Sequence, residues 1–374
     1  MNSSQLYRGL LALLVVLTLC MPASAAITLY DNEGTTFATD GFFNTFYVYH
    51  DDDSGQNQSR VKMGFLPNYI GFNFSKQAGD LKLGGRSSFW VSINDSDAEG
   101  TSTGIDVRQF YGTVDGDWGQ VLFGKDFTLF NRSNIFNDEI LIGFGKTGGV
   151  PGIDTNGVSF GNIGGGYTYP LPSAQITYRS PNLAGFILAV GLIDPSRTSG
   201  DGGEESAPRI EGELTFKKDF DLATVLAWGG FLTQSSKKGA DGDVDSQGLS
   251  YGLNVKFANV SLTGSGYTGE GIGKVLGPGL AVDALLDASG NEVDSSGYLV
   301  QGAYVIDKVR LVASYGYSEL ETATKAEDET VIGAVFYSVN SNLTLIAEYN
   351  IETITSGSTE NDIDTIALGA SLNF

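Results

Sequence analysis

The last segment of the chain, residues 362–374, alternates between apolar side chains and small or polar ones, and this pattern limits the fold more than any other feature. One face carries Ile366, Leu368, Ala370, Leu372 and Phe374, and the other carries Thr365, Ala367, Gly369, Ser371 and Asn373. Successive side chains of a strand point to opposite faces, so one face here suits lipid and the other suits water. The small, hydrophilic face predicts a water-filled interior, because a packed barrel interior would carry Val, Ile and Leu.

The same alternation recurs along the chain and predicts an all-β fold, a 16-stranded antiparallel transmembrane β-barrel. No stretch beyond residue 25 approaches the roughly 18 apolar residues of a membrane-spanning helix, whereas a lipid-facing strand needs only about 9 to 11 residues. The predicted strands are 35–50, 59–76, 81–94, two runs within 106–127, 174–181, 185–193, 207–217, 222–234, 248–257, 260–268, 297–305, 309–319, 329–338, 343–354 and 362–374, with a short N-terminal strand at 27–30. Short turns alternate with longer polar loops, predicted at 194–206, 235–247, 269–296 and 355–361, as in barrels inserted from the periplasm.

The first 25 residues, 1–25, are predicted to be a cleaved secretory signal peptide, so the mature chain would begin near Ala26. Arg8 supplies positive charge, residues 10–19 form an apolar core, and small residues precede the cleavage site. Cys20, the only cysteine, lies in this segment, which excludes disulfides and thiolate metal sites from the mature chain. The net charge of −22 argues against nucleic-acid binding, because the chain would repel a phosphate backbone.

One long segment lacks a strand pattern. Residues 131–172 follow the fifth predicted strand, are rich in glycine and form a connection far longer than usual. We expect this segment to fold into the lumen as a constriction loop, while the rest of residues 26–374 forms the barrel wall.

Four segments carry a resemblance to a known family. The start ITLYDNEGTTFATDG, the pair VRQFYGTVDGDWGQVLFGKD, the segment ITYRSP and the ending IALGASLNF resemble the general porins of Gram-negative outer membranes. The resemblance implies a homotrimer of channels, a third external loop folded inward after the fifth strand, and closure of the sheet by residues 27–30 beside the last strand. It also implies that the barrel-assembly machinery reads Phe374. Lipopolysaccharide and outer-membrane lipid are the other expected partners.

In this family a basic cluster on the wall faces acidic groups on the inward loop, and the resulting field helps to set selectivity. Lys62 in VKMGF and Lys125 in FGKD match basic wall positions, where the family usually has Arg. Arg86 and Arg179 lie on predicted inward faces and are further candidates. By strand alternation, Lys125 lies on the same face as Val121 and Phe123. It would point inward only if Gly124 formed a bulge.

On the loop, Asp138 and Glu139 are the acidic pair expected at the constriction, although the Pro-Glu-Phe-Gly-Gly segment of the family is absent. The alternative for every one of these wall and loop residues is an ordinary solvated charge of the lumen.

Other motifs indicate neither a nucleotide site nor a catalytic site. Residues 143–148 match G-x-G-x-x-G, but no helix follows to present its N-terminus to a phosphate, so a lumen loop is the preferred interpretation. Asp241, Asp243 and Asp245 have the opening spacing of a calcium loop without its later glycine and glutamate, which leaves weak divalent-ion binding as an alternative. His50 is interpreted as an exposed loop residue rather than a catalytic base.

The predicted function is that of an outer-membrane porin, a passive diffusion channel for small hydrophilic solutes and ions without reaction or cofactor. The net charge predicts a preference for cations, which a Debye length of ~8 Å weakens for charges on external loops. The alternative within transport is a substrate-specific channel, with Tyr and Trp forming a track for a sugar or organic solute. An outer-membrane enzyme such as a lipase is disfavoured by the single histidine, and a secreted glycan-binding sandwich by the continuously apolar outer faces.

Overall fold

A computed structural model of the chain describes residues 26–53, 55, 57–94, 104–147, 159–195, 204–239, 242–275, 285–324 and 326–374. The predicted signal peptide lies outside these residues. Within the described ranges no helix is both long enough and apolar enough to cross a membrane.

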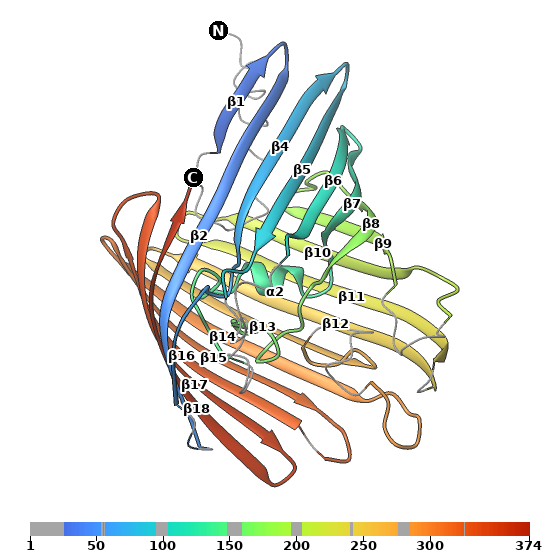
Figure 1. Ribbon diagram of the computed structural model, residues 1–374. Coiled ribbons are helices and arrows are strands. Elements are labelled where there is room, and N and C mark those ends of the chain that lie inside the picture. The colour runs from blue at the N-terminus through green and yellow to red at the C-terminus, as the bar shows by residue number, and fades with distance from the viewer. Residues whose placement is uncertain are drawn as a thin grey trace.

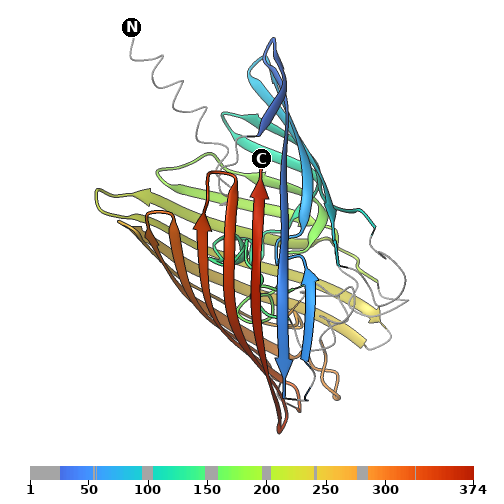
Figure 2. The same cartoon turned by 60° about the vertical axis from the view of Figure 1, so that its left-hand side comes forward.

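The strands form one closed antiparallel sheet, drawn in Figure 1 and from a second side in Figure 2. The elements in chain order are β1 (Ile27–Asn32), β2 (Thr35–Asp52), β3 (Asn57–Lys62), β4 (Asn68–Ala78), β5 (Leu81–Val91), β6 (Asp106–Gly116), β7 (Gly119–Phe127), α2 (Arg132–Phe136), β8 (Pro172–Arg179), β9 (Phe186–Ile193), β10 (Arg209–Asp219), β11 (Thr224–Gly239), β12 (Gly242–Phe257), β13 (Val260–Glu270), β14 (Asp294–Ile306), β15 (Val309–Leu320), β16 (Ala326–Ser338), β17 (Leu343–Ser356) and β18 (Thr359–Asn373).

These 18 strands make a wall of 16 because two wall strands are each built from two pieces. β3 and β4 pair with successive parts of one edge of β2. On the other edge of β2, β1 pairs with the first part and β18 with the rest, which closes the ring. Figure 2 shows this closure as the red C-terminal strand beside the blue β2. The predicted 16-stranded antiparallel barrel is therefore confirmed.

The alternation that predicted the barrel determines which side chains meet lipid. Leu345 on β17 and Leu368 on β18 are about half exposed on the outside, whereas Asn350 and Thr365 are buried on the inside. Paired residues of an antiparallel sheet share a face, and Ala347 lies opposite Leu368, so the outer faces of the two strands match. The outer surface is therefore apolar, as hydrocarbon requires.

Two predicted external loops belong largely to strands instead. Most of residues 235–247 lies in the β11–β12 hairpin, and residues 355–361 lie in the β17–β18 hairpin around a turn at Gly357. The prediction was wrong because these hairpin ends are polar on both faces. A strand that extends beyond the bilayer needs no apolar face, so the alternating signal disappears although the pairing continues.

The connection between β7 and β8 lies inside the ring of strands, where both views show the green segment that carries α2. Its described parts, 128–147 and 159–171, are mostly buried. We call them the inner segment. Phe144 of this segment packs with Phe46 of the wall, and a second apolar cluster joins the segment to Leu299. The inner face is thus not uniformly small and hydrophilic as predicted, because the wall beneath the segment buries its apolar side chains.

Candidate functional site

Glu348 on β17 attaches the inner segment to the wall. Its carboxylate accepts hydrogen bonds from the backbone N–H groups of Phe144, at 3.0 Å, and of Gly145. Gly145 has a φ of +77° and lies against Gly161, where an added Cβ would come within 2.3 Å of the Gly161 Cα. This glycine of the G-x-G-x-x-G match therefore allows two backbone segments to approach closely, which is a packing role. Gly148, which ends the match, lies outside the described residues.

An ion cluster attaches the next residues of the inner segment. The Lys146 side chain is 2% exposed, pairs with Asp328 on β16 and lies 3.6 Å from Glu352 on β17. Burial lowers the pKa of Lys146, but the two carboxylates raise it by more, so the ammonium remains charged. Glu352 also accepts a hydrogen bond from the Thr147 N–H at 3.1 Å. The segment thus docks through charge as well as apolar packing.

Asp138 does not face the open lumen. It is 5% exposed and accepts hydrogen bonds from the Tyr167 hydroxyl at 2.6 Å, from the Gln301 amide at 2.7 Å and from Asn162 at 3.1 Å. Burial raises the pKa of Asp138, and these hydrogen bonds oppose the rise only in part. Asp138 is therefore an internal anchor between the inner segment and β14.

Glu139 also contacts the near wall. Its carboxylate lies 3.1 Å from the Arg310 guanidinium on β15 and accepts a hydrogen bond from Ser261 on β13 at 2.6 Å. The structure therefore places both predicted loop acids against the wall behind the segment. They do not face the predicted basic residues across a gap, as the resemblance implies.

The basic side of the lumen is formed by β5 to β8 together with the start of the inner segment. Arg86 on β5 binds both carboxylate oxygens of Asp40, at 2.7 and 3.0 Å. Arg86, Arg179 on β8 and Arg132 of α2 all lie close enough to Tyr111 on β6 to interact electrostatically. Among the described residues, Arg179 makes no direct ion pair or hydrogen bond. Two of the four predicted basic wall residues are therefore brought together, and Arg132 joins them.

Aromatic rings support three arginines of this side. A guanidinium over the face of an aromatic ring is attracted by its quadrupole, which restricts where the charge can move. The pairs, with the distance from guanidinium carbon to ring centroid, are Arg86 with Tyr69 at 5.7 Å, Arg108 with Trp90 at 5.0 Å and Arg132 with Phe136 at 5.0 Å. The rings thus hold Arg86 and Arg108 against the wall and Arg132 within α2 of the inner segment.

Neither of the two predicted wall lysines is open to the lumen, as a pore residue would be. Lys62 at the end of β3 pairs with buried Phe46 and is itself only 4% exposed. Lys125 pairs with Phe110, which is 61% exposed on the outer face. Gly124 has a φ of +130°, but the register runs through it without a shift, so no bulge turns the chain. Lys125 therefore lies on the outer face, and its prediction as a pore residue was wrong.

The remaining candidates have structural roles. His50 is buried within β2 rather than exposed in a loop, because the strand extends beyond the predicted end. Asp243 and Asp245 lie on β12 beside Lys237, whose Nζ is 3.9 and 3.0 Å from their carboxylates, and Asp241 lies outside the described residues. In the part of the chain that the structure describes, no cluster of His, Cys, Asp and Glu could hold a metal ion.

A closed 16-stranded barrel with charged groups facing its lumen is the geometry of a membrane channel. Residues 11–353 match the family model described as Gram-negative porin. The chain belongs to this family. This porin is accordingly an outer-membrane protein, and its family and fold are those of a channel rather than of an enzyme. Among curated protein sequences none matches it.

Solved structures with the same architecture support the assignment of the fold. The outer membrane channel DcaP of Acinetobacter baumannii superposes with a TM-score of 0.72 at 17% identity, over 93% of this porin and 100% of DcaP. An anion-selective porin from Comamonas acidovorans superposes with a TM-score of 0.66 at 14% identity, over 91% of this porin and 100% of the other chain. The trimer form of OmpT, an outer membrane protein of Vibrio cholerae, superposes with a TM-score of 0.56 at 17% identity, over 91% of this porin and 100% of OmpT.

Proposed function

We propose that this porin is a passive diffusion channel for small hydrophilic solutes and ions, in which residues 131–172 narrow the lumen. The observation that supports this proposal most strongly is a polar wall that the inner segment leaves partly exposed. Arg86, Tyr111, Thr113 and Arg179 on β5, β6 and β8 are partly exposed on that wall. The hydrogen bonds of the inner segment run mainly to β10 and to β13–β17, on the other side.

A cavity supports the same pathway at the end of the barrel that carries the short turns. It has a volume of ≈ 320 Å³ and is lined by Glu139, Lys256, Asp307 and Arg310, among others. Charged groups of both signs thus line the approach to the inner segment from this end. Such a lining is wetted by water and suits polar solutes.

We propose in addition that the channel prefers cations. Exposed carboxylates on the outer side of the rim, at the long-loop ends of five strands, support this preference, because negative charge around an entrance raises the local concentration of cations. They are Asp51, Glu270, Asp294, Glu321 and Asp364. Arg179 acts in the opposite direction, since it places a positive charge in the lumen. The ratio of cation to anion permeability should therefore depend on the salt concentration, because salt screens the exposed carboxylates more than the charge of Arg179 in the lumen.

The reversal potential in a salt gradient tests this selectivity. We expect its sign to indicate cation preference, and the preference to fall as the mean salt concentration rises. Arg179→Gln should increase the preference because it removes a lumen charge, whereas Lys125→Gln on the outer face should leave it unchanged. A clear anion preference of the wild-type channel at low salt would refute the proposal.

A substrate-specific channel for an organic solute is the second candidate, and the row of arginines on aromatic rings favours it. Guanidinium groups held in place could bind the charged or hydroxylated part of a solute. Liposome swelling distinguishes the two candidates. Rates that saturate for one solute class, and lose saturation in Arg86→Met, would favour the specific channel, while rates that depend only on solute size would favour general diffusion.

We propose a homotrimer, supported by the trimer form of OmpT as a structural neighbour. Chemical cross-linking of the unheated protein should give a species of three chains.

We also propose that Phe374 is recognised during assembly in the outer membrane. Its ring stacks on Phe43 at 5.9 Å, and its backbone bonds to Gly41, so the folded barrel holds this residue at the closing seam.

A further inference from the structure

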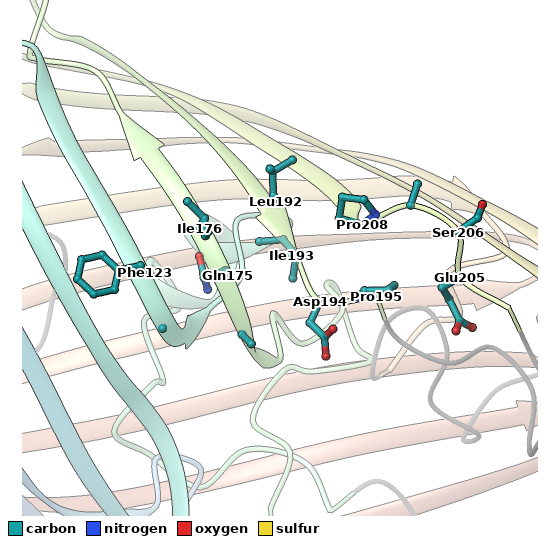
Figure 3. Close-up of a pocket in the computed structure, with 13 residues that line it drawn as sticks. Phe123, Gln175, Ile176, Leu192, Ile193, Asp194, Pro195, Glu205, Ser206 and Pro208 are labelled. Carbon is teal, nitrogen blue, oxygen red and sulfur yellow. The ribbon is translucent and has the colours of Figure 1, made fainter.

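Two cavities of this porin differ in the molecules that they can accept. The one of ≈ 660 Å³ is a groove on the outer face of β7, β8 and β9, where Figure 3 shows Phe123, Ile176 and Leu192, each about half exposed to lipid. The one of ≈ 320 Å³ lies inside the barrel, between the inner segment and the short-turn ends of β12 and β14–β17. Sites for small molecules have volumes of about 300 to 1,000 Å³, so the inner cavity can hold a small solute of the lumen.

Apolar side chains form one side of the inner cavity. Phe136 and Ile142 of the inner segment line it and are partly exposed, and Val305 on β14 is 39% exposed. Val305 lies two positions from buried Ala303, so both side chains are on the inner face of the strand. A solute with an apolar group would therefore remove apolar surface from water when it enters the cavity.

Two charged residues of the lining satisfy each other. The guanidinium of Arg310 lies 3.1 Å from the carboxylate of Glu139, and it donates to the backbone oxygen of Glu139 at 2.8 Å. The same guanidinium lies 4.0 Å from the ring centroid of Phe336. This pair therefore holds the inner segment against β15 and presents no unpaired charge to a solute.

Three other charged side chains of the lining are exposed, namely Lys256, Asp307 and Lys308. Lys256 lies two positions from buried Asn254 and therefore on the inner face of β12. Within the described part of the chain, the side chains of Lys256 and Asp307 make no ion pair or hydrogen bond, and that of Lys308 donates only to the Val339 carbonyl oxygen, at 3.3 Å. The cavity thus offers two ammonium groups and one carboxylate beside an apolar surface.

We propose that this cavity binds a small zwitterion with an apolar side chain, which is the chemistry of a free apolar amino acid. The carboxylate of the solute lies between Lys256 and Lys308, its ammonium group contacts Asp307, and its side chain covers Phe136 and Ile142. A simple anion would leave Asp307 without a partner, and a simple cation would leave both lysines without one. The inference rests on the proposed diffusion function, which brings the solute to this end of the lumen.

The test is equilibrium dialysis of the full-length mature protein in detergent, with radiolabelled L-phenylalanine as the probe and empty micelles as the blank. We expect saturable binding. Three unlabelled competitors each lack one part of the probe: 3-phenylpropionate lacks the ammonium group, 2-phenylethylamine lacks the carboxylate, and glycine lacks the apolar side chain. Each should compete at least about five-fold more weakly than unlabelled L-phenylalanine, since each loses one exposed ion pair or the apolar contact.

Variants assign each part of the solute to its partner. Lys256→Gln and Asp307→Asn should each weaken binding of L-phenylalanine about five-fold. Asp307→Asn should leave the affinity for 3-phenylpropionate unchanged, because that competitor has no ammonium group. Lys256→Gln should likewise not weaken binding of 2-phenylethylamine, which has no carboxylate. Lys218→Gln and Asp221→Asn, at the turn between β10 and β11, are matched controls that should bind the probe as the wild type does.

Uptake of the probe no greater than that of empty micelles would overturn the proposal, as would equal binding by the wild type, Lys256→Gln and Asp307→Asn. Competition by 3-phenylpropionate as strong as that by L-phenylalanine would also overturn it, because Asp307 would then contribute nothing. Single-channel recording of the same preparation separates this inference from the proposed channel function. A conducting porin that fails to bind the probe refutes the zwitterion site alone, whereas a porin that binds the probe and passes no current refutes the channel alone.

Discussion

Replacement of Lys146 by Met should loosen the inner segment from β16 and β17. The side chains of Lys146, Asp328 and Glu352 are 2%, 6% and 1% exposed, so water does not compensate for the lost ion pairs. Removing one partner of a buried ion pair costs about 3 to 5 kcal/mol, because the other charge is left buried. This cost destabilises the docked state alone, since a segment that detaches exposes the stranded carboxylates to lumen water. About 3 kcal/mol corresponds to a roughly 100-fold larger detached population.

Hydrogen exchange of backbone amides measures that population directly, because an amide exchanges when its segment opens. The N–H groups of Phe144, Gly145 and Thr147 donate to Glu348 and Glu352, so they report on docking. We expect about 100-fold faster exchange of these amides in Lys146→Met, while amides of the wall strands keep their wild-type rates.

Two variants control for this effect. Lys237→Met removes a lysine whose side chain is 40% exposed beside Asp245, and should leave the exchange of the inner segment unchanged. Adding Asp328→Asn and Glu352→Gln to Lys146→Met removes the stranded charges and should restore much of the protection. Wild-type exchange rates in Lys146→Met would refute the reasoning, since the ion cluster would then contribute nothing to docking.

Further predictions concern the wall and the terminus. Gly316→Ala should displace the inner segment and change single-channel conductance, because the added Cβ would lie 1.9 Å from a carbonyl oxygen of that segment. Gly333→Ala should leave the conductance unchanged, because its Cβ would meet nothing within 4 Å. Arg86→Met should increase cation preference in reversal-potential measurements by leaving Asp40 unpaired in the lumen, and adding Asp40→Asn should reverse the increase. Phe374→Ala should lower the amount of folded porin in outer membranes of cells, as judged by heat modifiability, yet permit refolding in detergent; normal assembly in cells would contradict its role as a signal.

The architecture was predictable because it depends on local alternation. A residue such as Leu368 shows its lipid-facing role through its neighbours two positions away, and the same rule repeats on every strand. The same rule also predicts the correct orientation of Lys125, because Lys125 lies two positions from Phe123 and therefore on the same face. The motif resemblance predicted an inward Lys125 instead. The continuous register through Gly124 shows that the alternation determines its orientation.

The interior was less predictable because its contacts join distant parts of the chain. Lys146 and Asp328 are 182 residues apart, and Thr147 and Glu352 are 205 apart. Nothing near Asp138 in the sequence indicates Gln301 as its partner. Glu348 and Glu352 appear in the sequence only as polar residues of an inward face, and their role depends on a segment folding against them.

A channel requires a water-filled path through the folded barrel. Single-channel recording of purified porin in planar bilayers tests this path most directly. We expect stepwise, ohmic conductance from heat-modifiable protein, with three equal levels for each insertion event. Folded barrels that insert into the bilayer and pass no current would contradict it.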